Sequence, residues 1–208
     1  MRLIATSIVL SALLLLSAFA EDTGKTEQSL QQVVARLAVP AVLRGKFTQS
    51  RSIKEISRPL VSNGSFVLSD KGLYWKQEKP IIRMMIADGE RLIDQIGDGP
   101  LQIIDAEKQP LVLPFSRIFL SIFRGNEAEL RSNFDIEYRN QGDGWEIELA
   151  PTSYPMSEAI DTINLGGREY IEELTVTTRS SEQTMIKFSD LRTDPNQLTE
   201  YEIELYAR

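Results

Sequence analysis

The side chains of this sequence that could do chemistry are carboxylates, hydroxyls and a group of large apolar residues. The 208 residues include no histidine and no cysteine. Nucleophile systems of the Ser-His-Asp and Cys-His kinds are therefore excluded, as are the usual zinc and iron ligand sets. A hydrolase that uses paired carboxylates and a calcium site built from oxygen ligands remain open.

The positions of the carboxylates do not favour either of these sites. The Gly-Asp-Gly at 97–99 and the Gln-Gly-Asp-Gly at 141–144 lie between alternating segments and predict turns. Most other Asp and Glu side chains fall on the outward positions of predicted strands. We therefore expect that the protein is not an enzyme and has no catalytic residue, metal or cofactor.

Large apolar side chains are the remaining signal. Taken singly, each is best explained as ordinary core. As a set, with a Phe-rich segment framed by prolines in mid-chain, they leave a ligand-lined cavity open as the alternative. The candidate lining residues are Phe47, Phe66, Leu68, Leu73, Tyr74, Trp75, Met84, Ile86, Phe115, Ile118, Phe119 and Ile122.

Helical spacing of apolar residues occurs only near the start and in the middle of the chain. It predicts one helix over 26–39 and a short one after Pro114, with a further helical segment from Asn126 to just before Phe134. Elsewhere apolar and polar residues alternate, and we expect about eleven strands from twelve alternating segments. The segments are 42–53, 58–69, 72–77, 80–89, 91–96, 101–105, 134–139, 145–149, 159–166, 170–179, 183–191 and 199–207.

The predicted strands have one polar and one apolar face. Arg44, Lys46 and Thr48 lie on the polar side of the first strand, and Glu202 and Glu204 on that of the last. A sheet of this size with one apolar face must curl onto itself, stack against a second sheet or be covered by helices. Two or three helices cannot cover the whole face. We therefore predict a mainly β fold, a curled half-open barrel with helices across its mouth.

Residues 1–20 have the pattern of a secretory signal peptide. A basic start precedes the apolar run 3–16, and Ala18-Phe19-Ala20 forms a small-residue cleavage site. We expect 21–208 to form one domain in the periplasm of a Gram-negative bacterium. Loss of Arg2 with the leader leaves 22 basic and 30 acidic side chains, a net charge near −8. This charge argues against nucleic acid as a partner.

Short motifs along the chain occur in the order and spacing of a known family. They are Phe47-Thr48-Gln49, Gly64-Ser65-Phe66, Leu73-Tyr74-Trp75, Pro80 and Asp88-Gly89. In this order the sequence resembles the LolA-type periplasmic lipoprotein carriers, and LPFSRIFLSIF at 113–123 resembles their lid helix. The resemblance implies an unclosed antiparallel β-barrel of about eleven strands, with a helical lid over a hydrophobic cavity for acyl chains, and no covalent catalysis. We expect Phe66, Leu68 and Trp75 to face that cavity and Tyr74 to lie near its mouth.

The resemblance also implies partners. They are an acylated lipoprotein or other lipid cargo, an inner-membrane exporter of the ABC type or another lipid exporter, and an outer-membrane acceptor lipoprotein. We expect a monomer. The alternative is a lipid- or lipoprotein-sensing interaction domain in envelope signalling.

One segment departs from the family pattern. Members have an arginine before the aromatic-Trp pair that ties the lid shut, whereas this chain has Ser69-Asp70-Lys71-Gly72. Lys71 would supply the charge of a lid contact but not the planar donor fork of arginine. The resemblance therefore leaves the cargo open between a lipoprotein and another lipid.

Overall fold

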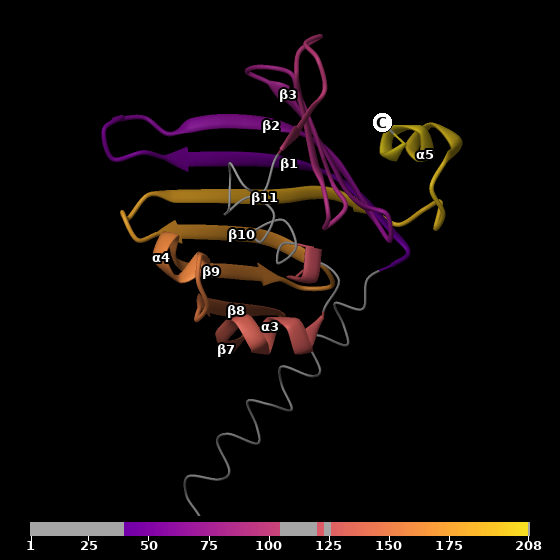
Figure 1. Ribbon diagram of the computed structural model, residues 1–208. Helices are drawn as coiled ribbons and strands as arrows, with labels where there is room; N and C mark the ends of the chain where they lie inside the picture. The colour runs from indigo at the N-terminus through magenta and orange to yellow at the C-terminus, as the bar shows by residue number, and fades with distance from the viewer. Residues whose placement is uncertain (1–39, 105–119, 123–125, 208) are drawn as a thin grey trace, which may run out of the picture.

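The computed structural model describes residues 40–104, 120–122 and 126–207 (Figure 1). The predicted leader, the predicted helix 26–39 and three candidate lining residues, Phe115, Ile118 and Phe119, lie outside the described residues.

Eleven antiparallel strands form one sheet, which is not closed into a barrel. The strands are β1 (Val42–Ser52), β2 (Leu60–Ser69), β3 (Gly72–Lys79), β4 (Arg83–Ala87), β5 (Leu92–Ile96), β6 (Gln102–Ile104), β7 (Phe134–Gln141), β8 (Gly144–Pro151), β9 (Ile160–Gly167), β10 (Ile171–Thr178) and β11 (Gln183–Arg192). Their order is β6-β5-β4-β3-β2-β1-β11-β10-β9-β8-β7, so β6 and β7 are the edges. Figure 1 shows β3 and its neighbours turned away from the direction of β7–β11. The predicted unclosed, mainly β fold is confirmed.

Short helices accompany the sheet: α3 (Glu127–Asn133), α4 (Met156–Ala159), α5 (Glu200–Tyr206) and the helical residues 120–122. The Asn126 side chain accepts a hydrogen bond from the Glu129 backbone N–H and so caps α3. The helix begins and ends where the sequence predicted. Within the described ranges, no helix has the length and apolar content needed to cross a membrane.

The segment 199–207 was predicted as a strand, and this prediction is wrong, because the segment forms α5. Its apolar residues fit both periods over so short a stretch. Thr199 and Glu202 decide between them through a capping box, in which each side chain bonds the backbone N–H of the other. Glu202, Leu205 and Tyr206 then share the buried side of the helix.

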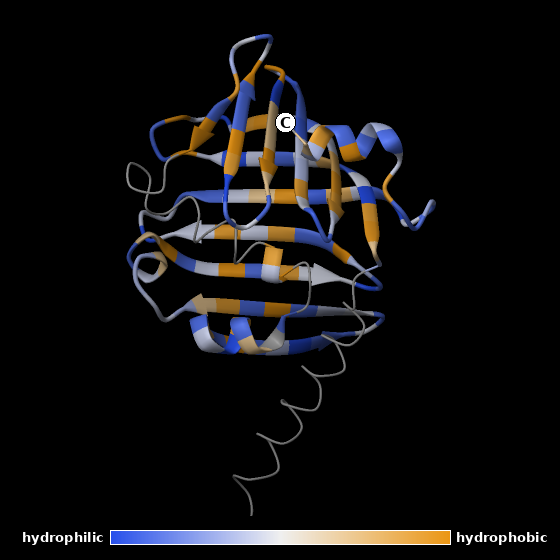
Figure 2. Ribbon diagram, turned by 45° about the vertical axis from the view of Figure 1, so that its right-hand side comes forward, coloured by the Kyte–Doolittle hydropathy of each residue, from blue (hydrophilic) through white to orange (hydrophobic). Residues whose placement is uncertain are grey.

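Two apolar clusters lie on opposite faces of the sheet. We call the face that carries Phe47 and Phe66 the inner face, and the face beneath α5 the outer face. Alternation of apolar and polar residues along the strands is visible in Figure 2. The inner cluster draws on most strands, whereas the outer cluster contains six buried residues. These are Tyr74, Met84, Ile86, Ile93, Leu205 and Tyr206.

Arg44 and Glu202 were predicted to be solvent-facing, and the structure contradicts this. Arg44 Nε donates to Glu202 Oε1 at 2.6 Å and Arg44 Nη2 to Glu202 Oε2 at 2.7 Å. The same guanidinium also donates to the backbone oxygens of Pro195 and Gln197. Their side chains are only 5% and 10% exposed because α5 covers this part of the outer face. The pair therefore ties the C-terminal segment to β1.

Candidate functional site

Four aromatic rings form the centre of the inner face. Phe47 stacks on Trp75 with ring centroids 3.6 Å apart and planes inclined by 22°. Phe188 meets Phe66 edge-on at 5.4 Å and Trp75 at 6.4 Å. These are the stacked and edge-to-face arrangements that aromatic rings prefer. The rings come from β1, β2, β3 and β11, so the cluster joins the middle strands into one apolar surface.

Strand register explains why these rings meet. Phe47 lies opposite Phe188, and Phe66 lies opposite both Trp75 and Gly45. A Cβ at Gly45 would be 2.7 Å from Cε1 of Phe66, closer than side chains pack. The absence of a side chain at Gly45 therefore allows the Phe66 ring to lie against β1.

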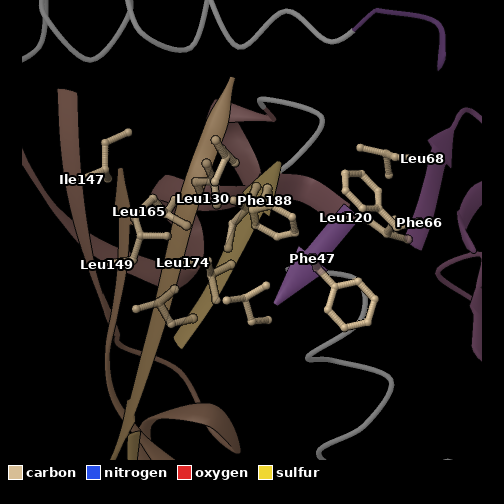
Figure 3. Close-up of a cluster of buried hydrophobic side chains, with 14 of the residues drawn as sticks. Phe47, Phe66, Leu68, Leu120, Leu130, Ile147, Leu149, Leu165, Leu174 and Phe188 are labelled. Atoms are coloured by element: carbon tan, nitrogen blue, oxygen red, sulfur yellow. The ribbon is translucent and has the colours of Figure 1, made fainter. Parts of the chain in front are cut away.

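The apolar surface continues over the other half of the sheet. Leu149, Ile163, Leu165 and Leu174 are at most 2% exposed and belong to the same cluster as Phe47. Figure 3 shows labelled side chains of this half and of the Phe47 half pointing into a common region. Such a surface can bind hydrocarbon by contact, because transfer of apolar area out of water is favourable and non-directional.

Residues of the mid-chain segment cover part of this surface. Leu120 and Ile122 are each 2% exposed and pack in the inner cluster. Ser121 between them donates a short hydrogen bond to the Glu129 carboxylate, and the backbone N–H of Asn126 donates to the Ser121 carbonyl. The described end of the predicted lid segment therefore lies on the inner face and is fastened to α3.

The structure brings some of the predicted lining residues together. Phe47, Phe66, Leu68, Trp75 and Ile122 belong to the inner cluster, and Leu73 is half-buried against it. Lipid contact by these side chains stays a prediction.

Tyr74, Met84 and Ile86 do not join that group. They point to the outer face and pack beneath Leu205 and Tyr206. The reason is the two-residue period of a strand, which sends Tyr74 to the face opposite Leu73 and Trp75. Tyr74 is thus packed under α5 rather than lying among the inner-face residues.

Sequence reasoning missed several members of the inner cluster. Phe188 completes the aromatic group, and Trp145 lies on β8 with its Nε1–H donated to the Arg168 carbonyl at 2.8 Å. Met85, the cross-strand partner of Trp75, packs against the cluster edge. The alternation of Ile186 and Phe188 in β11 is the signal that could have found Phe188.

Lys71 lies exposed in the turn between β2 and β3. Its backbone N–H donates to Ser69 Oγ at 3.1 Å. Residues 105–119, which include most of the predicted lid helix, lie outside the described residues. The predicted lid contact of Lys71 stays a prediction.

An ion pair lies toward one margin of the inner face. Asp94 is the cross-strand partner of Met85, and its side chain is 8% exposed. Arg83 Nε donates to Asp94 Oδ1 at 2.6 Å and Arg83 Nη2 to Oδ2 at 3.1 Å. This bidentate pairing satisfies the carboxylate, so the margin is polar without leaving a buried charge uncompensated.

A hollow of about 710 Å³ lies over β8–β11 and has a mainly polar lining. Its charged groups pair with one another, as Arg168 with Glu172 at 3.1 Å and Lys187 with Glu173 at 3.4 Å. Within the described part of the chain, no group of three Asp, Glu, His or Cys residues could hold a metal ion. The polar lining makes this hollow a poor match for hydrocarbon.

An unclosed antiparallel sheet with one continuous apolar face defines a half-barrel protein. The chain belongs to the LolA family: the family profile described as "Outer membrane lipoprotein carrier protein LolA" matches residues 41–199. No curated protein matches the sequence.

Two solved structures resemble the fold at low sequence identity. One is a domain from Vibrio parahaemolyticus described as an outer membrane lipoprotein-sorting protein, with a TM-score of 0.49 and 10% identity, covering 89% of this chain and 99% of that chain. The other is a LolA superfamily protein from Nitrosomonas europaea, with a TM-score of 0.47 and 9% identity. The match covers 85% of this chain and 96% of that chain. Family membership therefore rests on the sequence match.

Proposed function

We propose that the protein is a periplasmic carrier that binds the acyl chains of a lipoprotein or another lipid at its inner face. The observation that carries this proposal is the single apolar surface that extends from Phe47 and Trp75 to Leu149 and Leu165. Each methylene group removed from water contributes about 0.8 kcal/mol, so an acyl chain needs area more than it needs specific polar contacts.

Release is as necessary as binding for a carrier. Leu120 and Ile122 cover the inner face from a segment outside the sheet. A cover of this kind can move aside for an acyl chain and return after the chain has left, without any strand of the sheet being rearranged. The direction of transfer then depends on the difference in affinity between the donor and the acceptor.

The remaining parts of the proposal concern the route of the cargo and the form of the protein that carries it. The cargo passes from an inner-membrane exporter, of the ABC type or another type, to an outer-membrane acceptor lipoprotein. Residues 1–20 direct export and are removed, and the mature protein acts as a monomer without a catalytic step. The LolA profile match over 41–199 supports the proposed cargo and partners, and the leader pattern of residues 1–20 supports export.

Native tryptophan fluorescence tests the binding site directly. The chain has two tryptophans, and both Trp75 and Trp145 belong to the inner cluster. A brominated fatty acid quenches tryptophan only on contact, so titration should give saturable quenching. Lipid extraction of protein isolated from cells, followed by mass spectrometry, should identify the natural cargo.

The matched control moves the tryptophan to another surface. In a variant with Trp75→Phe, Trp145→Phe and Tyr201→Trp, the only tryptophan lies at a position of α5 where the native side chain is 65% exposed. This variant should show no saturable quenching. Equal quenching of both proteins, or none of the native protein, would refute acyl binding at the inner face.

A further inference from the structure

Most exposed large apolar side chains of the described residues lie at one end of the sheet. Of eleven such residues, Tyr201 and Ile203 lie on α5, Ile103 lies within the edge strand β6, and Tyr154 lies between β8 and α4. The other seven, which we call the apolar rim, are Ile56, Leu60, Val61, Ile81, Ile82, Ile96 and Leu101. Scattered exposed apolar residues need no explanation, but a concentration at one end of a molecule marks an interaction surface.

Strand register places these residues at a common end. Arg51 near the end of β1 pairs with Leu60 at the start of β2, and Asn63 of β2 pairs with the last residue of β3. Arg83 at the start of β4 pairs with Ile96 at the end of β5. The loops between these strands therefore project from the same end, and α5 lies at the other end of β1 and β11 (Figure 1).

The most prominent part of the rim is built by two adjacent turns. Ile81 and Ile82, in the β3–β4 turn, are 60% and 56% exposed. The backbone N–H of Gly97 in the β5–β6 turn donates to the Ile82 carbonyl at 2.8 Å, and Gln77 Nε2 donates to the Ile81 carbonyl at 2.8 Å. Hydrogen bonds thus hold the two turns together while their aliphatic side chains point into solvent.

The charge beside the rim is opposite to that of the whole chain. Segments 51–61, 76–83 and 96–101, which carry the rim residues, contain six Lys or Arg, two Glu and one Asp, whereas the whole chain has a net charge of −7. Arg51 and Arg83 are paired with acidic side chains, and Lys54, Arg58 and Lys79 are exposed. A basic region around aliphatic turn tips is the chemistry that recognises a bilayer containing anionic lipid.

We propose that the apolar rim docks the protein on the surface of a bilayer that contains anionic lipids, with Ile81 and Ile82 inserted among the acyl chains. Turn tips with branched aliphatic side chains fit the loosely packed interfacial region of a bilayer. A protein partner would instead favour a surface rich in aromatic residues and poor in lysine. This inference does not depend on what the inner face binds.

Vesicle flotation of protein purified from cells tests the inference. Vesicles of phosphatidylethanolamine and phosphatidylglycerol should carry the native protein upward, and vesicles of phosphatidylcholine alone should carry much less. The double variant Ile81→Ser with Ile82→Ser should lower the partition coefficient by about tenfold or more, because two aliphatic side chains lose their burial in hydrocarbon. The matched control, Tyr201→Ser with Ile203→Ser, changes two exposed residues of α5 and should leave partition unchanged.

A second measurement locates the inserted residues. Because the chain has no cysteine, Ile82→Cys and Ile203→Cys each allow one environment-sensitive fluorophore to be attached. The label at position 82 should shift to shorter emission wavelength on anionic vesicles, and the label at 203 should not. An absence of flotation, equal loss in both double variants, or equal shifts of both labels would overturn the proposal. Binding of the rim to a protein without any binding to vesicles would also overturn it.

Discussion

The inner and outer clusters are apolar groups on opposite faces of one sheet, and they are closed by different means. α5 covers the outer cluster and is locked by the Arg44–Glu202 pair and by Tyr206, whose hydroxyl donates to the carbonyls of Val67 and Gly72. The described cover of the inner cluster consists of Leu120 and Ile122, whose aliphatic side chains pack in it, and Ser121 between them donates to the Glu129 carboxylate of α3. Hydrogen bonds and an ion pair thus hold α5 on the outer face, whereas aliphatic side chains cover the inner face and can exchange with an apolar ligand.

The largest expected effect comes from breaking the Arg44–Glu202 ion pair, which holds α5 on the outer face. Glu202→Ala leaves the Arg44 guanidinium buried without its counter-ion, which should cost about 3–5 kcal/mol in the free energy of unfolding. Urea denaturation measures the loss. The control is Lys46→Ala, since Lys46 pairs with Asp190 at the surface, where the Lys46 side chain is 68% exposed. It should cost much less than Glu202→Ala, because an exposed ion pair is screened by water and contributes little. If both variants lose the same free energy of unfolding, the Arg44–Glu202 pair contributes no more stability than an exposed ion pair.

Paired truncations on the two faces sharpen the comparison. Leu68→Ala on the inner face and Ile86→Ala on the outer face each remove a buried aliphatic side chain, 1% and 3% exposed. Each should cost about 2–5 kcal/mol. Fatty-acid affinity, measured by tryptophan quenching, should fall several-fold for Leu68→Ala only, because only that side chain lies on the proposed binding surface. A similar loss of affinity in both would remove the functional distinction between the faces.

Acid should weaken the Arg44–Glu202 ion pair. The hydrogen bonds from Arg44 lower the pKa of Glu202 from 4.5 to about 2. A carboxyl with a lowered folded-state pKa contributes stability that is present above pH 4.5 and lost as the pH falls toward 2. The stability difference between the native protein and Glu202→Gln should therefore shrink over that interval. A constant difference in urea denaturation from pH 6 to pH 2 would contradict this assignment.

The smallest expected effect is at the tip of α5. Tyr206→Phe removes a donor shared by two backbone carbonyls and should cost about 1–2 kcal/mol. Burial raises the pKa of Tyr206 to about 12, so the native protein should lose stability above pH 10, where the unfolded chain ionises first. The variant should lose less over the same alkaline range in thermal unfolding.

The strands were predictable because their side chains alternate locally. Phe66 and Leu68 share a face with Trp75, and the glycine-containing turns fall where the chain reverses. The bounds of α3 were also predicted, although its Asn126 cap was not named in advance. At 199–207 the two periods could not be separated, and the capping box that decided for helix was overlooked. Grouping Tyr74, Met84 and Ile86 with the inner residues failed because type and proximity in sequence were weighed above strand alternation.

Local periodicity in the sequence by itself determined the strands, their turns and which side chains within one strand share a face. Only the tertiary structure decided which face receives the mid-chain segment and which receives α5. Arg44 and Glu202 are 158 residues apart, and each has the pattern of a solvated strand residue. Pairing across that distance depends on where β11 returns beside β1. Side-chain alternation is a property of a few neighbouring residues, whereas burial is a property of what the whole sheet brings together.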